Sequence, residues 1–235
     1  MRKILLLFIM LNLCGFAAEK INYSDIKYVK GKYYNENGIM NGEYEVVFDK
    51  AETKTYESVM DGRKFEYKVL SGMSTFVNGN INSNLASALY DESGNPIIVK
   101  KVEGDYVVSY VYNNNKLFEM ISREKVNFFE SMLFSEKYDG IVSGPYKTYY
   151  ENENVKEEGV LKTHRTVLSC SYNTCQVKYS GEKNGIVKRY YESGKLESET
   201  EYKVGEKNGY TRYYDESGNL TKTEKYSKGV LKKTI

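Results

Sequence analysis

Two cysteines in the C-terminal half carry the side chains best suited to chemistry. Cys170 and Cys175 enclose four residues in the run CSYNTC, and His164 is the only histidine of the chain. A zinc site needs about four ligands, which this set does not supply. A catalytic redox pair usually encloses two residues near the start of a helix. In an exported protein a close pair is most simply a disulfide, so we predict a Cys170–Cys175 disulfide at a hairpin tip, with no metal and no cofactor.

Carboxylates are the second group that could support a reaction. Glu197, Glu199 and Glu201 alternate with less polar residues, which is typical of the wet face of a strand rather than of an acid–base pair. The chain has no G-x-G-x-x-G or G-x-x-x-x-G-K-S/T phosphate loop and no G-x-S-x-G elbow. We therefore predict that the protein is not an enzyme, and we expect no small-molecule substrate.

The N-terminus has the layout of a secretory signal peptide. Two basic residues precede an apolar run over 4–13, and small residues follow it. The run is shorter than the roughly 20 residues that span a bilayer. We predict a signal peptide over 1–18, cleaved after Ala17 or Ala18, and export to the periplasm, cell envelope or medium. Cys14 leaves lipidation open, although the residue before it is leucine where a small residue would be expected.

The charge of the exported chain is close to zero. The full sequence has 34 basic and 32 acidic residues, and residues 1–17 contain two basic residues and no acidic one, which leaves 32 of each. No net field would then draw the protein to nucleic acid or to anionic lipid. We expect no nucleic-acid partner.

The composition favours an all-β protein. The chain has 24 Tyr and 9 Phe but only 2 Pro. Tyrosine suits a pleated, half-buried surface, because its ring packs while its hydroxyl stays in water.

A repeat of 24 residues organises the C-terminal part. The run GEKNG stands at 181–185 and again at 205–209, and YESGKL at 191–196 matches DESGNL at 215–220. Glycine lets the chain take the left-handed conformation that closes a hairpin, so we predict repeat turns at Gly194, Gly218, Gly205 and Gly229. Beyond the first turn, Leu196 and Tyr202 share one face of a strand. Each unit is therefore a β-hairpin, and neighbouring units should pair side by side into an antiparallel meander.

The repeat weakens towards the N-terminus. Partial copies stand at 144–159, 112–117, 89–96 and 32–42, and in the first of these Asn152 and Asn154 flank the expected turn. We predict a degenerate repeat region over 19–140 and well-formed repeats over 141–235, with a hairpin inserted at 163–179. The repeat is poorly visible at 48–84. The apolar segment 121–140 is either local core or an end cap, with a partner-binding patch as the alternative.

The repeated tyrosines are the best candidates for a binding face. They would form ladders along the sheet, where they either hold the sheet together or offer aromatic contacts to a protein, a glycan or a membrane surface. The candidates are Tyr149, Tyr150, Tyr190, Tyr191, Tyr202, Tyr213, Tyr214 and Tyr226.

These units resemble the MORN repeat variant of bacterial YwqK-like proteins, whose repeats combine glycine, a tyrosine pair, a glycine turn, leucine, glutamate and tyrosine. The resemblance is specific over 181–229 and patchy upstream. It implies an elongated, single-layer antiparallel β-meander of repeated hairpins. Tyrosine–aspartate repeats form much longer arrays, and choline-binding repeats rely on Trp, which is absent.

Three functions are compatible with this resemblance. The first is an exported, non-enzymatic scaffold that binds another protein. The second is the antitoxin component of a toxin–antitoxin system, a label that many YwqK-like proteins carry. The third is a lipid-associated or phosphoinositide-associated module, since related repeats accompany phosphatidylinositol-phosphate kinases. Export speaks against an inhibitor of a cytoplasmic toxin, and we favour the scaffold.

Overall fold

The computed structural model describes residues 18–82, 86–125, 142–171 and 174–235, with only the backbone described between 165 and 179. The predicted signal peptide up to residue 17 and most of the apolar segment 121–140 lie outside these ranges. The boundary predicted at residue 140 also falls there and stays a prediction.

The described chain is almost entirely β-strand, as the composition predicts. In chain order the elements are β1 (Glu19–Asn22), a 3-10 helix η2 (Tyr23–Asp25), β2 (Lys27–Val29), β3 (Lys32–Asn35), β4 (Gly38–Ile39), β5 (Gly42–Glu57), β6 (Lys64–Val77), β7 (Asn80–Ile81), β8 (Ser87–Tyr90), β9 (Pro96–Glu103), β10 (Tyr106–Asn113), β11 (Lys116–Glu124), β12 (Gly144–Tyr149), β13 (Val155–Ser171), β14 (Thr174–Lys183), β15 (Gly185–Tyr190), β16 (Leu196–Lys203), β17 (Glu206–Tyr214), β18 (Leu220–Ser227) and β19 (Val230–Thr234).

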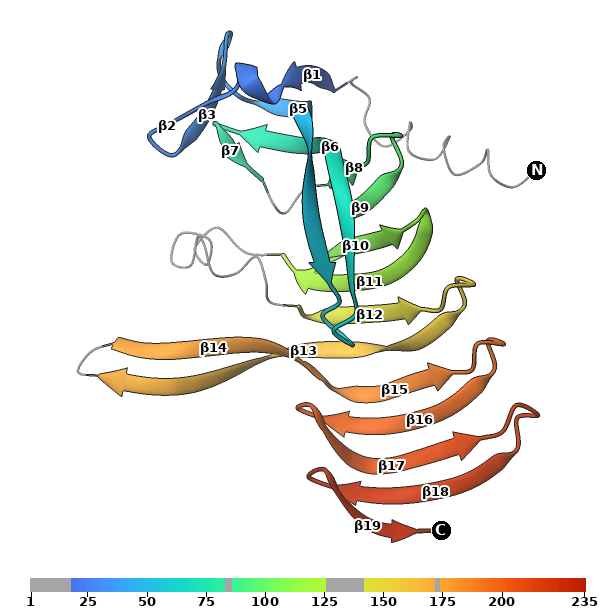
Figure 1. The fold of residues 1–235 in the computed structure, drawn as a ribbon. Helices are drawn as coiled ribbons and strands as arrows, with labels where there is room; N and C mark the ends of the chain where they lie inside the picture. Colours follow the sequence, from blue (N-terminus) through green and yellow to red (C-terminus); the bar gives the residue numbers. More distant parts are fainter. Residues whose placement is uncertain (1–17, 83–85, 126–141, 172–173) are drawn as a thin grey trace.

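Within the described residues, sixteen of these strands form one open sheet, and β2, β3 and β4 form a small second one. Strand order in the large sheet follows the chain from β8 onwards, except that β14 lies off this path and pairs with β13. Neighbouring strands are antiparallel, apart from β1, which joins β5 in parallel. Figure 1 shows this sheet as an elongated stack of hairpins from β8 to β19. The predicted fold class, an elongated antiparallel β-meander, is confirmed.

Turns of one kind recur along one edge of the sheet. At 91–95, 150–154, 191–195 and 215–219, the first N–H donates to the fifth carbonyl, and the fourth N–H donates to the first carbonyl. The fourth residue has a positive φ in each case, +84° at Gly194 and +87° at Gly218. At 150–154 this residue is Glu153, with φ +67°. The flanking Asn152 and Asn154 do not take a positive φ there.

Tighter two-residue turns close the opposite edge of the repeats. Val204–Gly205 has φ values of +49° and +76°, and Lys228–Gly229 has +49° and +75°. Two positive φ values define the type I′ turn, which favours Asn-Gly. The chain uses that pair at Asn78–Gly79, with φ +49° and +74°. A β-branched valine is costly in the left-handed region, so Val204 is a strained choice.

Replacing this valine should stabilise the protein. We expect Val204→Asn to raise the free energy of unfolding by about 1 kcal/mol, because asparagine tolerates the left-handed conformation. Val204 is 45% exposed, so little packing is lost. The measurement is urea unfolding followed by circular dichroism. Lys228→Asn, at the matching position of the next repeat, should gain less because lysine is not β-branched. An unchanged urea midpoint for Val204→Asn would contradict the interpretation that the backbone of Val204 is strained.

The segment in which the repeat is poorly visible forms a long hairpin. Strands β5 and β6 pair along their length, with a register shift between Val47 and Glu52. The first half of β5 and the second half of β6 pair with further strands of the sheet, whereas residues 52–57 and 64–69 pair only with each other within the described chain. In Figure 1 this teal hairpin crosses over the sheet and its tip reaches the level of β12 and β13. It adds a second layer there, which the 24-residue pattern does not predict.

Two clusters of packed apolar side chains stand out in the described core. Met40, Tyr44 and Phe76 form one cluster near the N-terminal end. The other contains Ile121, Tyr146 and Leu161, with Met60 of the hairpin tip packed against it. The hairpin tip therefore covers part of the second cluster, and Val142 packs against it as well.

The predicted inserted hairpin is an arm made of β13 and β14. The two strands pair with each other from Leu161 and Lys183 to Ser171 and Thr174, and the register sets Cys170 directly opposite Cys175. Figure 1 shows the arm extending sideways from the stack. Opposed residues of an antiparallel pair have Cα atoms about 4.5–5.5 Å apart, a separation that a disulfide can bridge. The disulfide itself stays a prediction.

Candidate functional site

The eight predicted tyrosines are all half-buried, and several bind neighbouring repeats. The Tyr150 hydroxyl donates to the Tyr190 carbonyl at 2.7 Å, and the Tyr191 hydroxyl donates to the Tyr214 carbonyl at 2.7 Å. The second tyrosine of each pair thus fastens one turn to the next. These hydroxyls are structural connectors between repeats.

A second connector recurs at the opposite edge, with the 24-residue period. The Lys183 ammonium lies 5.6 Å from the centre of the Tyr202 ring, and that of Lys207 lies 4.8 Å from the Tyr226 ring. The carbonyls of the same two lysines accept from the N–H groups of Gly205 and Gly229, each at 2.9 Å. The lysine of GEKNG therefore binds the following unit through both its backbone and its side chain.

Other tyrosines donate to carboxylates. Tyr190 binds Glu158 at 2.6 Å, while Tyr213 and Tyr226 bind Glu224 at 3.0 and 2.8 Å. Hydrogen bonds from Tyr226, Lys222 and Tyr213 lower the pKa of Glu224 to about 2. These carboxylates stay ionised near neutral pH and act as acceptors for the sheet.

Charged side chains of opposite sign alternate across five strands. Register places Lys147, Glu158, Lys188, Glu199 and Arg212 in one row from β12 to β17. Lys147 binds Glu158 at 2.8 Å, and Lys188 lies 3.7 Å from Glu199. Opposite charges on directly paired strands stabilise the pairing. Glu199, which the sequence places on the wet face, therefore belongs to a cross-strand row.

A buried carboxylate joins four strands where the arm leaves the sheet. Glu157 of β13 accepts from the Tyr146 hydroxyl at 2.7 Å, from Lys183 at 2.6 Å and from Arg189 at 3.0 Å. Its side chain is 9% exposed. Burial alone would raise the pKa of Glu157, but the hydrogen bonds from Lys183, Tyr146 and Arg189 outweigh it and hold the pKa below its usual value.

The lowered pKa makes Glu157 a source of acid sensitivity. Its stabilisation is present above the unfolded-state pKa of about 4.3 and is lost as pH falls through the lower folded-state pKa. We expect Glu157→Gln to cost about 2 kcal/mol at pH 7, since it removes a buried ionic acceptor. Between pH 7 and pH 3 the melting temperature should fall more steeply for the parent than for Glu157→Gln.

The matched control is Glu199→Gln, which removes a more exposed carboxylate of the cross-strand row. That change should cost no more than about 0.5 kcal/mol. If the melting temperatures of the parent and of Glu157→Gln fall by the same amount below pH 5, the role of Glu157 is contradicted.

The hairpin over the sheet is held at its tip. Glu119 of β11 is fully buried, and its carboxylate accepts from the hydroxyls of Tyr56 and Ser58, the latter at 2.7 Å. Burial and the neighbouring Glu119 raise the pKa of Tyr56. Phe118 packs against Phe65 with ring centres 5.2 Å apart. These contacts place β6 beside the turn edge of the sheet.

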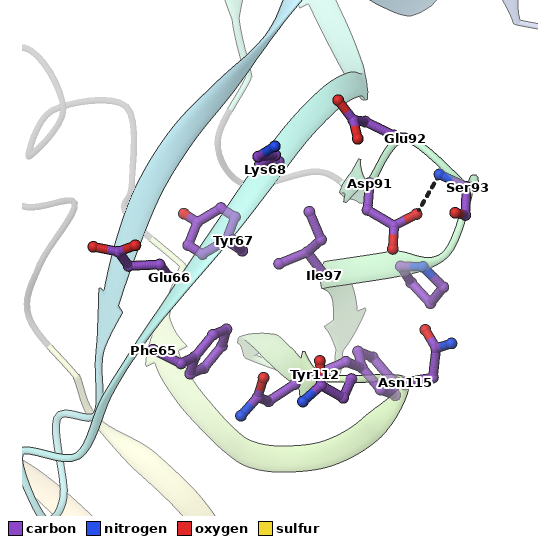
Figure 2. Close-up of a pocket in the computed structure, with 13 residues that line it drawn as sticks. Phe65, Glu66, Tyr67, Lys68, Asp91, Glu92, Ser93, Ile97, Tyr112 and Asn115 are labelled. Carbon is purple, nitrogen blue, oxygen red and sulfur yellow. Dashed lines mark hydrogen bonds between the residues drawn. The ribbon is translucent and has the colours of Figure 1, made fainter.

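Two adjoining grooves lie between β6 and that turn edge. The first, of about 450 Å³, is lined by Phe65, Tyr67, Tyr112 and the turns at 91–93 and 113–115. Figure 2 shows β6 as one wall and these turns as the opposite wall, with Ile97 between them. Asp91 holds its turn in shape, since its carboxylate accepts from the N–H groups of Ser93 and Asn95.

The second groove, of about 410 Å³, continues towards the hairpin tip and shares Asn113 and Asn114 with the first. Its lining includes Phe118 and two of the predicted tyrosines, Tyr149 and Tyr150. It also includes three cations and one acid, Arg63, Lys64, Lys116 and Glu151. The Arg63 guanidinium stacks on Phe118 at 4.3 Å and binds Asp61 at 2.7 Å, which fixes its position.

The grooves differ from the site predicted from sequence. Tyr149 and Tyr150 lie there, whereas Tyr190, Tyr191, Tyr202, Tyr213, Tyr214 and Tyr226 lie along β15 to β18. Sequence reasoning missed the hairpin wall. The alternating aromatic residues of KFEYK at 64–68 were the available signal.

The described residues contain no group of three or more His, Cys, Asp and Glu side chains arranged to hold a metal ion. No helix in the same part of the chain is long and apolar enough to span a membrane. The most buried carboxylates of the described residues, Glu119, Glu157 and Glu224, all bind donors within the fold.

Comparison with known proteins identifies two of the repeats. The model of the MORN repeat variant family matches residues 143–162 and 183–203. The first match covers β12 and the start of β13, and the second covers β15 and β16. A search of curated proteins found no match. The chain thus carries MORN-type repeats, built as the hairpin units described above.

Proposed function

We propose that this chain is an exported, non-catalytic scaffold that binds a protein partner, and that the two grooves beside β6 are its binding site. MORN repeats generally serve as modules for protein or membrane interaction. The observation that carries the proposal is the hairpin layer. It converts one edge of an open sheet into a groove lined by aromatic, amide and charged side chains.

The chemistry of the grooves supports recognition of a protein. Aromatic side chains and arginine are enriched where proteins bind one another, and the second groove combines Phe118 and Tyr149 with Arg63. The turns opposite β6 are held by their own hydrogen bonds, as at Asp91. A preformed surface loses less conformational entropy on binding than a mobile one.

Identifying what binds the grooves would also test two narrower roles. An antitoxin of the YwqK-like type would bind a toxic protein, and a lipid or phosphoinositide module would bind a membrane surface. No contact in the described structure favours either over a scaffold. The identity of what binds the grooves separates the three roles.

Export is tested by the mature N-terminus. We expect cell fractionation to place the protein outside the cytoplasm, and mass spectrometry to find a chain that begins at residue 18 or 19, because cleavage follows Ala17 or Ala18. An Arg2→Glu, Lys3→Glu double variant should reduce export, since the signal needs its basic start. A cytoplasmic protein that keeps residues 1–17 would contradict export.

Binding at the grooves is tested by photo-crosslinking in native cells. We place a benzophenone amino acid at Lys116, which is exposed in the second groove, and separately at Lys225, which is exposed on β18. We expect a discrete protein adduct from position 116 and none from position 225. Equal adducts from both positions, or none from position 116, would count against the proposed site.

A further inference from the structure

Strand β6 has an open edge beside the grooves. From Lys64 to Val69 it pairs with β5 on one side only. Strand β8 pairs with β6 at 71–73, and β7 pairs with it at 76–77. Within the described residues, no strand pairs with the other edge over 64–69. An open edge of this kind presents unpaired backbone donors and acceptors to a new strand.

The register shows which backbone groups point outwards. At the end of the hairpin the Ser58 N–H donates to the Arg63 carbonyl at 2.8 Å. Antiparallel pairs alternate between residues that exchange hydrogen bonds and residues whose backbone groups point away. Counting along β6 from Arg63, the outward groups belong to Lys64, Glu66 and Lys68.

These outward groups face a groove rather than open solvent. The first groove is lined by the consecutive residues 65–68, as expected when a strand borders it with its edge. In Figure 2 the turns that contain Asp91 and Asn115 stand across from β6. Six residues of strand extend over roughly 20 Å, so the edge can pair with a peptide of five or six residues.

Charge differs between the two ends. The second groove, at the hairpin tip, is lined by three cations and one acid, Glu151. The first groove is lined by three acids, Glu66, Asp91 and Glu92, and one cation, Lys68. A strand laid along β6 would meet cations at one end and carboxylates at the other. This favours a peptide with the opposite charges.

We propose that the free edge of β6 binds an extended peptide segment of a protein partner by strand addition. The bound segment carries acidic residues next to Arg63 and Lys116, and a basic residue next to Asp91 and Glu92. Backbone hydrogen bonds supply affinity in this mode, and alternate side chains enter the pockets beside Phe65 and Tyr67. The inference rests on the proposed scaffold function and specifies how the partner is held.

One substitution tests the mode without removing a contact of the hairpin. Glu66→Pro deletes an outward N–H, which β5 does not use, and proline is tolerated on edge strands. The matched control is Thr55→Pro. Thr55 of β5 lies directly opposite Glu66, and its backbone N–H points away from β6, towards the far edge of the hairpin. Both variants should keep the circular dichroism spectrum of the parent.

The probe is a nine-residue peptide of alternating valine and threonine, with two glutamates at one end and two lysines at the other. Fluorescence anisotropy with the full chain should give saturable binding, weakened at least tenfold by Glu66→Pro and less than twofold by Thr55→Pro. Methylating alternate backbone nitrogens of the peptide should abolish binding. Peptide binding to the parent should also slow amide hydrogen exchange at Lys64, Glu66 and Lys68.

Several results would overturn strand addition. These are no saturable binding of the probe to the parent, equal binding to Glu66→Pro and the parent, or protection of amides on β5 instead of β6. Binding of a neutral oligosaccharide in place of the peptide would also overturn it. The scaffold proposal is judged separately: a crosslink from position 116 that persists in Glu66→Pro supports the scaffold and rejects strand addition.

Discussion

The second layer of this protein depends on one buried carboxylate. Glu119 has 0% exposure, and both of its oxygens bind hydroxyls of the β5–β6 hairpin, from Tyr56 and Ser58. Buried polar oxygens are costly unless they are hydrogen-bonded, so the sheet and the hairpin need each other at this point. The apolar contacts of Met60 and Phe65 then follow. Without this fastening there would be no wall beside the turn edge, and the grooves would be open solvent.

The C-terminal repeats solve a different problem, because no described element covers them. Apart from Val187, at 3% exposure, the buried uncharged side chains of these repeats are small and polar, with Ser198, Thr200 and Thr211 at 5%, 7% and 1% exposure. Burial of apolar area therefore contributes less here than in a two-layer domain. Hydrogen bonds between turns, rows of opposite charge and ammonium–ring contacts hold neighbouring strands in register. Each of these is local, so each repeat contacts mainly the next one.

Much of the array could be predicted because its determinants are local. Gly194 and Gly218 close their turns with positive φ, as a repeat with glycine at those places requires. The hairpin layer could not be predicted, since it depends on a contact between residues 63 apart in sequence, Tyr56 and Glu119. For the same reason only Tyr149 and Tyr150, of the proposed tyrosine face, lie in the grooves. At 150–154 the surrounding structure holds Glu153 in the left-handed conformation that glycine takes in the other turns.

The nearest-neighbour construction of the repeats has a mechanical consequence. Tension applied to the C-terminus would peel β19 from β18, and then each earlier hairpin from the one before it, because the strands lie side by side in chain order. Each 24-residue unit would release roughly 80 Å of extended chain. The array would therefore lengthen in equal steps under load, until the pull reached the arm and the four strands joined by Glu157.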